Sequence, residues 1–271
     1  MPELPEVESI ARRLTERLVG RCIASVEVRW AGAVDRPAVD AFVNKLSGQR
    51  VRAVQRRGKF VIIELDGRAL LVHLRMAGRL LMCPATQPEL LQDPYVRALF
   101  RLDDGSVLVF RDVRKFGRLY LVQDPAELVG QLGPEPLTDA FTPEALSACL
   151  RRKRQLKPLL LDQHVLAGLG NIYTDEALWA AQLHPLRSAD SLSADEVARL
   201  HEAIRAVLRH AIDDGGTTLR DYRGCDGEPG EHQYALAVYG RRAQPCPRCG
   251  AAVERIVVGQ RGTHLCPICQ K

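Results

Sequence analysis

Two Cys-x-x-Cys pairs near the C-terminus carry the clearest chemistry in the sequence. The first pair is Cys246 and Cys249, and the second is Cys266 and Cys269, with sixteen residues between the pairs. Each pair brings two thiolates to one tight turn, and two such turns close a tetrahedral four-sulfur site for zinc. Four thiolates leave no position for water, so we expect one structural zinc ion. The length between the pairs suits a β-hairpin.

The opening residues can supply a nucleophile. If Met1 is removed, Pro2 becomes a secondary amine. The pKa of an α-amino group is roughly 7.7–8.0, so a fraction of the molecules carries a neutral, nucleophilic Pro2 nitrogen at pH 7. Its condensation with a sugar C1′ would give a permanently cationic iminium that acidifies the C2′ protons for elimination. Glu3 is adjacent and can act there as an acid or base. The same composition, prolines and acids before a helix, also fits an ordinary helix entry.

A glycine-rich turn at 168–170 separates two predicted helices, 157–167 and 171–182. Asn171 stands where the second helix begins, and the free N–H groups of a helix N-terminus can bind phosphate. A helical hairpin with glycine in its turn is also common as a purely structural element.

Basic residues gather in three segments, although the net charge of +5 is modest. Segments 48–60 and 151–157 each hold five basic residues and no acid, and 241–271 holds six against one acid. If these segments converge in space they form an electrostatic footprint for phosphates. The alternative is that they are solvated faces of a basic protein.

The periodicity of apolar residues divides the chain. A short amphipathic helix comes after Pro5 and ends at Gly20. Short segments rich in β-branched residues then predict an antiparallel sandwich or barrel. These segments are 24–30, 50–55, 60–65, 69–76, 107–110 and 118–122.

Beyond a linker at 133–136 the period is helical, with Pro143 opening one helix and a Ser193/Glu196 capping box opening another. Segment 217–239 has few core residues and predicts a mobile loop. The remaining C-terminal residues are too few to hold a core without a metal. We predict an N-terminal domain over 1–132, a helical domain over 133–238, and a zinc finger over 239–271.

Composition narrows the class of protein. Hydrophobic residues make up 46% and charged residues 26%, as in ordinary globular proteins. The opening residues lack the apolar core of a secretory signal, and no apolar run approaches the roughly 18 residues that span a membrane. The other four cysteines are scattered singly, which favours metal over disulfides. We expect a soluble cytoplasmic protein with no membrane partner.

These signals in this order resemble the formamidopyrimidine-DNA glycosylase family of bifunctional repair enzymes, which also includes the endonuclease VIII branch. The opening is similar to the formamidopyrimidine branch. The resemblance spans the chain in seven segments: PELPEVE at 2–8, RRGKF at 56–60, HLRMAG at 73–78, DVRKFG at 112–117, GLGNIYTDEAL at 168–178, GGTTLRDY at 215–222 and QRGTHLCPICQK at 260–271.

The resemblance implies an α+β fold. In this fold an N-terminal helix and an antiparallel β-sandwich form the catalytic domain. A helical helix–two-turn–helix domain follows, which binds DNA and carries the lesion-recognition loop, and the chain ends in a C-terminal β-hairpin zinc finger. The implied enzyme is a monomeric DNA glycosylase and abasic-site lyase that binds damaged double-stranded DNA. It removes oxidised purines, 8-oxoguanine and formamidopyrimidines, through an N-terminal proline Schiff base, with β,δ-elimination as the later step. Zinc is the implied cofactor.

The resemblance also implies residue roles. Pro2 is the nucleophile, Glu3 the acid and base, Lys59 the residue for β-elimination, and Arg261 a phosphate contact that assists δ-elimination. Further DNA contacts are implied for Glu6, Arg152, Lys157, Asn171 and Tyr239.

Met76, Arg114 and Phe116 are implied to enter the duplex. Apolar wedges and a guanidinium suit the hole and the widowed base that an extruded nucleotide leaves. From composition alone, Met76 and Phe116 could equally be core residues, and Lys59 one member of a basic strand.

Two positions depart from the family pattern. Asp93, Pro94 and Tyr95 align where a DNA-contacting histidine is usual, and Leu265 replaces an aromatic residue in the finger. Two rival functions also stand: an endonuclease VIII-like glycosylase for oxidised pyrimidines, and a non-catalytic zinc protein that binds DNA. Intact Pro2, Glu3 and Lys59 argue against the second.

Overall fold

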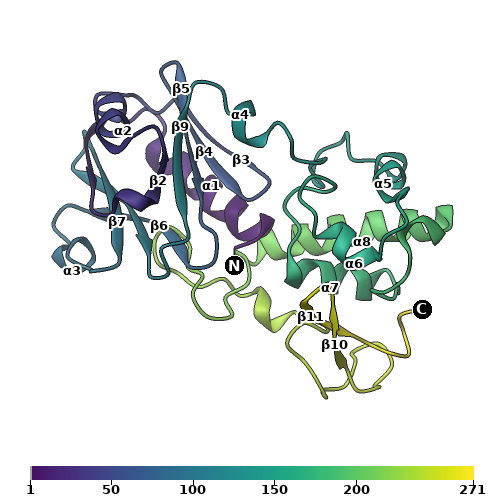
Figure 1. Cartoon of the computed structure of the whole chain (residues 1–271). Helices are drawn as coiled ribbons and strands as arrows, with labels where there is room; N and C mark the ends of the chain where they lie inside the picture. Colours follow the sequence, from purple (N-terminus) through teal and green to yellow (C-terminus); the bar gives the residue numbers. More distant parts are fainter. Residues whose placement is uncertain (1) are drawn as a thin grey trace. The chain divides into compact units, whose positions relative to one another are not determined.

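The computed structural model describes residues 2–271 and divides them into two compact units. The first unit runs up to Gly130 and also includes Asp214–Glu231, and the second combines Gln131–Asp213 with His232–Lys271 (Figure 1). Segment 214–231 therefore belongs by its contacts to the first unit, although the sequence grouped it with the helices. Within residues 2–271 no helix has the length and apolar character needed to cross a membrane.

Two β-sheets build the first unit. The four-stranded sheet has the order β1-β7-β8-β6 and the five-stranded sheet the order β2-β9-β5-β4-β3. The strands are β1 Ile23–Val28, β2 Val34–Arg36, β3 Ala53–Arg57, β4 Phe60–Leu65, β5 Arg68–His73, β6 Gly78–Pro84, β7 Val96–Leu102, β8 Ser106–Asp112 and β9 Arg118–Val122. Neighbouring strands pair antiparallel except β2 and β9, which are parallel, so the expected antiparallel sandwich has one parallel edge.

The helices of the first unit are short apart from the first. They are α1 Leu4–Leu18, α2 Val39–Leu46, α3 Pro88–Leu91 and α4 Ala126–Val129. Helix α1 packs against β3 and β4. Its apolar residues recur at helical spacing, so one stripe faces the core.

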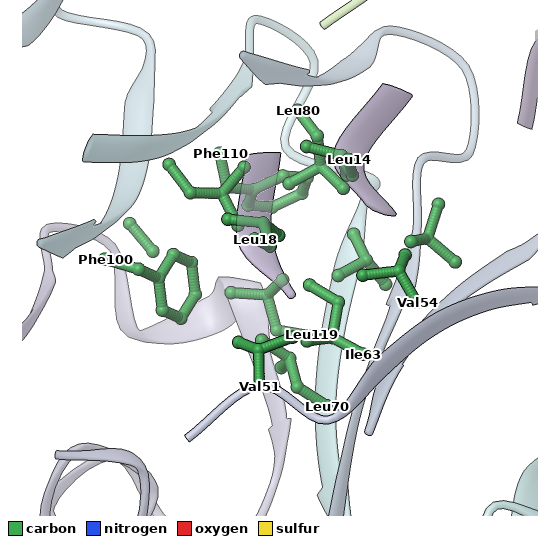
Figure 2. Packing of buried hydrophobic residues seen from close by; sticks show 14 of the residues in the cluster. Leu14, Leu18, Val51, Val54, Ile63, Leu70, Leu80, Phe100, Phe110 and Leu119 are labelled. Atoms are coloured by element: carbon green, nitrogen blue, oxygen red, sulfur yellow. The ribbon is translucent and has the colours of Figure 1, made fainter. Parts of the chain in front are cut away.

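One hydrophobic core joins α1 to both sheets, as a sandwich requires. Figure 2 shows Leu14 and Leu18 of α1 packed with Leu70 of the five-stranded sheet and with Phe100 and Phe110 of the four-stranded sheet. A separate cluster, with α3 packed against it, buries the other face of the four-stranded sheet. Because this sheet is buried on both faces, β6 and β7 lack the alternating pattern, and the sequence did not predict them.

The second unit is helical and ends in a hairpin. Its elements are α5 Pro143–Leu150, α6 Leu156–Leu160, α7 Asn171–Ala180, α8 Ala194–Asp213, β10 Glu254–Val258 and β11 Arg261–Leu265. The capping box ahead of α8 is confirmed, since Ser193 N donates to Glu196 Oε2 at 2.9 Å and Glu196 N to Ser193 Oγ at 3.3 Å. The hairpin between the cysteine pairs is confirmed as β10 and β11.

Helix α6 is much shorter than the helix predicted over 157–167. After Leu160 the backbone turns, because Asp162 Oδ1 accepts the N–H of His164 at 3.1 Å. The amide of Gln163 then bonds to the backbone at Leu161, Gly168 and Leu169, which fixes the turn before α7.

Segment 214–231 is better anchored than the sequence predicted. Its few core residues hold it in place, because Tyr222 and Cys225 are buried in the core of the first unit. The carbonyl of Cys225 accepts the N–H of Met82 in β6 at 2.7 Å. The Asp226 carboxylate lies 2.9 Å from the guanidinium groups of both Arg13 and Arg17 on α1. Charges and core contacts both hold this segment to α1 and β6.

Candidate functional site

The predicted nucleophile lies at the entry to α1. Pro2 and Glu3 are both buried, and Glu3 is the N-cap residue with an extended backbone. The N–H of Glu3 donates to Glu6 Oε2 at 2.7 Å, half of a capping box. This bond satisfies a backbone donor that the helix cannot pair and holds the residue next to Pro2 in place.

Glu6 also connects α1 to segment 214–231. Its Oε1 accepts the N–H of Thr217 at 2.8 Å, and the Tyr222 hydroxyl donates to its backbone carbonyl at 3.4 Å. Gly216 has a φ of +89°, and a Cβ there would lie 3.0 Å from Glu6 Cγ, so only glycine fits comfortably. The Glu6 carboxylate thus holds two backbone groups of the protein.

Lys59 lies in the turn between β3 and β4, the strands against which α1 packs. Its side chain is 7% exposed. Next to it, Arg56 Nε forms an ion pair with Glu8 Oε2 at 2.7 Å, and Arg56 also bonds to the Gly58 carbonyl. Burial opposes the charge of Glu8, but the hydrogen bonds and charges of Arg56 and Arg12 prevail and lower its pKa. The turn is therefore fixed to α1 by charge as well as packing.

His73 is a residue that sequence analysis missed. It pairs with Phe60 across β4 and β5, with ring centroids 4.6 Å apart. Burial, together with the charges of Arg75 and Lys59, lowers the pKa of His73 to about 3. A neutral imidazole therefore lies beside Lys59 and adds no positive charge to its surroundings. The motif HLRMAG contains this residue, but nothing in the motif signals neutrality.

The three predicted wedge residues occupy two neighbouring turns of the first unit. Met76 and Phe116 line one open pocket and are 40% and 48% exposed. The guanidinium carbon of Arg114 lies 5.0 Å from the centroid of the Phe116 ring. Exposed large apolar side chains grouped with an arginine are typical of a binding surface rather than a core. The alternative that Met76 and Phe116 are core residues is wrong.

Asp112 holds the turn that carries Arg114 and Phe116. This fully buried carboxylate accepts the N–H of Arg114 at 3.0 Å and that of Gly117 at 2.7 Å. Lys115, between them, has a φ of +60°, a conformation uncommon for a residue with a side chain. The buried carboxylate therefore stabilises a strained turn and presents its tip outward.

Asp93, one of the three residues that align where a histidine is usual, has its charge paired within the protein. Its carboxylate lies 2.8 Å from the Arg111 guanidinium and accepts the N–H of Tyr95 at 2.7 Å. Burial opposes its charge, but these contacts and nearby Arg97 lower its pKa. The repulsion of phosphate expected of an isolated aspartate is thus reduced.

In the second unit, Asn171 begins α7 and its Nδ2 donates to the carbonyl of Gly262 at 2.9 Å. Arg152 and Arg261 are exposed. Lys157, an implied DNA contact, is instead fully buried, with its Nζ 2.6 Å from Asp175 Oδ1.

Tyr239 lies where the chain leaves η3 (His232–Tyr234) for the finger, and Glu176 of α7 fixes this connection. The Glu176 carboxylate accepts the N–H groups of Ala237, Val238 and Tyr239 at 2.8–3.0 Å. Burial raises the pKa of Glu176, although these three bonds lower it. Sequence analysis missed Glu176, because the single acid carries no pattern of its own.

The four predicted metal cysteines come together. Their sulfur atoms all lie within 4.8 Å of one another, with Cys249 and Cys266 at 3.4 Å and Cys246 and Cys269 at 4.0 Å. A tetrahedron with Zn–S bonds of about 2.3 Å places its sulfurs about 3.8 Å apart, so the set fits one zinc ion. None of the eight cysteines, all of which lie within the described residues, forms a disulfide.

Trp179 connects the zinc site to α7. Its indole N–H donates to Cys246 Sγ at 3.4 Å, and the Arg248 guanidinium stacks on its ring at 4.3 Å. Arg248 also donates to the carbonyls of Trp179 and Ala180 at the C-terminal end of the helix. Burial opposes the charge of the Cys246 thiolate, but the Trp179 bond and backbone N–H groups prevail and lower its pKa to about 6.

The chain thus combines a two-sheet unit that exposes Met76, Arg114 and Phe116 with a helical unit that contains a glycine turn and a four-cysteine hairpin. Three family models match in order: the formamidopyrimidine-DNA glycosylase N-terminal domain at residues 1–119, its H2TH domain at 132–223, and a zinc finger found in FPG and IleRS at 243–271. The chain belongs to the formamidopyrimidine-DNA glycosylase family. It is thus a bifunctional glycosylase and abasic-site lyase of base-excision repair that acts on oxidised purines.

Relatives match over the whole chain. Formamidopyrimidine-DNA glycosylases of Herpetosiphon aurantiacus and Roseiflexus are 50% and 51% identical, with 100% of both chains covered in each case. A Lactococcus lactis family member in complex with Fapy-dG-containing DNA has a TM-score of 0.92 at 36% identity, again over 100% of both chains. The MutM (FPG) protein of Thermus thermophilus has a TM-score of 0.88 at 43% identity, covering 99% of this chain and 98% of that one.

Proposed function

We propose that Pro2, freed by removal of Met1, attacks C1′ of an oxidised purine nucleotide in duplex DNA. The bond from the Pro2 nitrogen to C1′ forms as the N-glycosidic bond breaks, and Glu3 supplies the proton that the departing base needs. The proposal is supported by the burial of Pro2 and Glu3 at the entry to α1, which packs on the strands flanking Lys59. Removal of Met1 itself lies outside the described residues.

The lyase steps start from the iminium, which forms when the Pro2 nitrogen loses its proton and the C1′–O4′ bond breaks, with Glu3 as the acid that protonates O4′. The cationic carbon of the iminium acidifies the C2′ protons. Loss of one C2′ proton expels the 3′ phosphate; this step is β-elimination, and we assign it to Lys59. A second proton loss expels the 5′ phosphate, the δ-elimination that we assign to Arg261 as a phosphate contact. Lys59 is buried in the turn between β3 and β4, the strands on which α1 packs, and this position supports its assignment to proton transfer.

Borohydride trapping tests this function. It reduces the iminium to a stable amine, so it reports the covalent intermediate and the preferred base together. We expect crosslinking to duplexes that contain 8-oxoguanine, slower crosslinking to duplexes with an oxidised pyrimidine, and none to undamaged DNA. Faster reaction with the oxidised pyrimidine would favour the endonuclease VIII-like alternative, and no crosslink to any lesion would favour a protein that only binds DNA.

We further propose that the enzyme works as a monomer on DNA in the bacterial cytosol. The bacterial relatives that match over the full chain support this assignment. Light scattering behind gel filtration should give the chain mass of 30.1 kDa, and twice that mass would contradict a monomer.

Arg114 is expected to set the choice of the opposite base. A guanidinium carries only donors, so it pairs well with O2 and N3 of a widowed cytosine and less well with adenine, which shows a donor on that edge. Discrimination of this kind is about 1–3 kcal/mol, so 8-oxoguanine opposite C should be excised roughly ten- to hundred-fold faster than opposite A. Arg114→Ala should bring that ratio close to one in single-turnover assays.

Arg114→Lys is the matched control for Arg114→Ala. It keeps the positive charge but loses the planar fork of donors, so it should retain DNA affinity and still lose most of the discrimination. If both variants discriminate as the wild type does, Arg114 does not contact the opposite base.

A further inference from the structure

A fully buried ion pair in the second unit also forms hydrogen bonds to the backbone of β11. Lys157 of α6 and Asp175 of α7 are both 0% exposed at their side chains, and Lys157 Nζ lies 2.6 Å from Asp175 Oδ1. The ammonium also donates to the carbonyl of Gly262 at 3.1 Å, and Asp175 Oδ2 accepts the N–H of His264 at 2.8 Å. Each charge therefore makes a second bond to the backbone of β11.

These bonds lie just beyond Arg261 in the chain. The carbonyl of Gly262 receives a further hydrogen bond from Asn171 Nδ2 at 2.9 Å, so two donors converge on one oxygen. The turn before Arg261 is also confined, since Gly259 and Gln260 have φ values of +54° and +61°. A Cβ on Gly259 would lie 2.9 Å from the Pro158 side chain, so α6 packs closely against the turn.

Stability alone does not account for the pair. Replacing a buried ion pair by apolar residues of similar volume is often neutral or stabilising, because burial removes both charges from water. Apolar residues could not hold the Gly262 carbonyl or the His264 N–H, whereas charge-assisted hydrogen bonds in a dry interior are short and directional. The Lys157 ammonium and the Asp175 carboxylate therefore bond to the backbone of β11 as well as to each other.

We infer that Lys157 and Asp175 are positioning residues that fix the backbone of β11 so that the exposed Arg261 meets its phosphate in one orientation. This inference rests on the proposed role of Arg261 in δ-elimination. In this role Lys157 acts from its buried position and does not need to contact DNA directly. A shift of about 1 Å in a catalytic group can lower a rate by about a hundredfold, so small movements of β11 are enough to matter.

The test measures the two eliminations separately on a duplex with a preformed abasic site. Products of β- and δ-elimination differ in their 3′ ends and separate on a denaturing gel. The variant Lys157→Met with Asp175→Leu replaces the pair by apolar side chains of similar size. We expect its rate of δ-elimination, relative to β-elimination, to fall at least about tenfold. Arg261→Ala should lower the same ratio.

The decisive comparison combines the substitutions. If the pair acts through Arg261, adding the double substitution to Arg261→Ala causes no further fall in the ratio, since non-additivity marks residues that act as a unit. An undiminished ratio in the pair variant, or an additive fall in the combined variant, overturns the inference. An undiminished ratio in Arg261→Ala overturns the proposed role of Arg261 and the inference with it.

Zinc content and the thermal midpoint, measured on every variant, separate positioning from folding. If the apolar variant does not fold, Asp175→Asn takes its place, because it keeps the size of the side chain and can serve only one of the two donors. A folded Asp175→Asn protein that holds zinc should also show a lowered ratio. If its ratio equals that of the wild type, the pair has only a structural role.

Discussion

Protein that begins at Pro2 should crosslink to lesion DNA under borohydride, and protein that keeps Met1 should not. In the longer chain the Pro2 nitrogen is an amide, whose lone pair is delocalised, so it cannot attack C1′. We expect the trapping rate to fall by at least about a hundredfold, the scale of losing one essential catalytic group. Intact mass spectrometry of each preparation gives the fraction that retains Met1, and the trapped fraction should track the processed fraction.

Pro2→Gly addresses the same atom in a processed chain. Glycine keeps an amine but loses the ring that fixes φ and the secondary nitrogen, whose iminium has no N–H to lose and therefore stays cationic. Trapping should slow strongly, while binding to an uncleavable abasic analogue should change little. Arg12→Ala, on the exposed face of α1, is the matched control and should trap normally. Normal trapping by a preparation that fully retains Met1 would exclude Pro2 as the nucleophile.

The zinc ligands could be predicted from the sequence because their chemistry is local. Two thiolates within one turn already fix half of a tetrahedral site, so spacing alone determines the geometry. The capping box at Ser193 is of the same kind, with its partner Glu196 three residues away. For such residues, the separation along the chain determines the distance in space.

Residues whose partners lie far along the chain could not be predicted in this way. Lys157 belongs to a basic run, and nothing in that run shows that this lysine alone turns inward to meet Asp175 and Gly262. The neutrality of His73 depends on burial between strands and on Lys59, which lies in a turn elsewhere in the sheet. Both properties arise from packing, and a single sequence does not encode packing as a pattern.

The segment after α8 shows the same limit. Its glycines and polar residues predict a loop, and it is a loop, but Tyr222 and Cys225 place it in the core of the first unit. Two buried apolar residues in a segment as long as Asp214–Glu231 leave no periodicity to detect. The segment is anchored by a carboxylate on α1, Glu6, whose partner Thr217 lies 211 residues later in the chain.

Cys249→Ser should release zinc and abolish tight binding to lesion DNA while the first unit stays folded. The cluster around the zinc ligands holds four buried residues, two of them ligands: Val238, Cys246, Val253 and Cys266. A core this small cannot offset the conformational entropy of the hairpin, so metal binding supplies its folding free energy. Loss of the hairpin would also release β11 and Arg261. We expect one zinc per chain in the wild type by elemental analysis and none in the variant.

Trp179 gives this prediction an optical readout. The chain has two tryptophans, so Trp30→Phe leaves Trp179, whose indole N–H bonds to Cys246 Sγ, as the only one. In that background its fluorescence should change when a chelator removes zinc, and Cys249→Ser should show the chelated spectrum from the start. Cys149→Ser, in α5, is the matched control and should keep zinc, fluorescence and DNA affinity. If the metal-free variant still binds lesion DNA as tightly as the wild type, the zinc finger does not contribute to DNA binding.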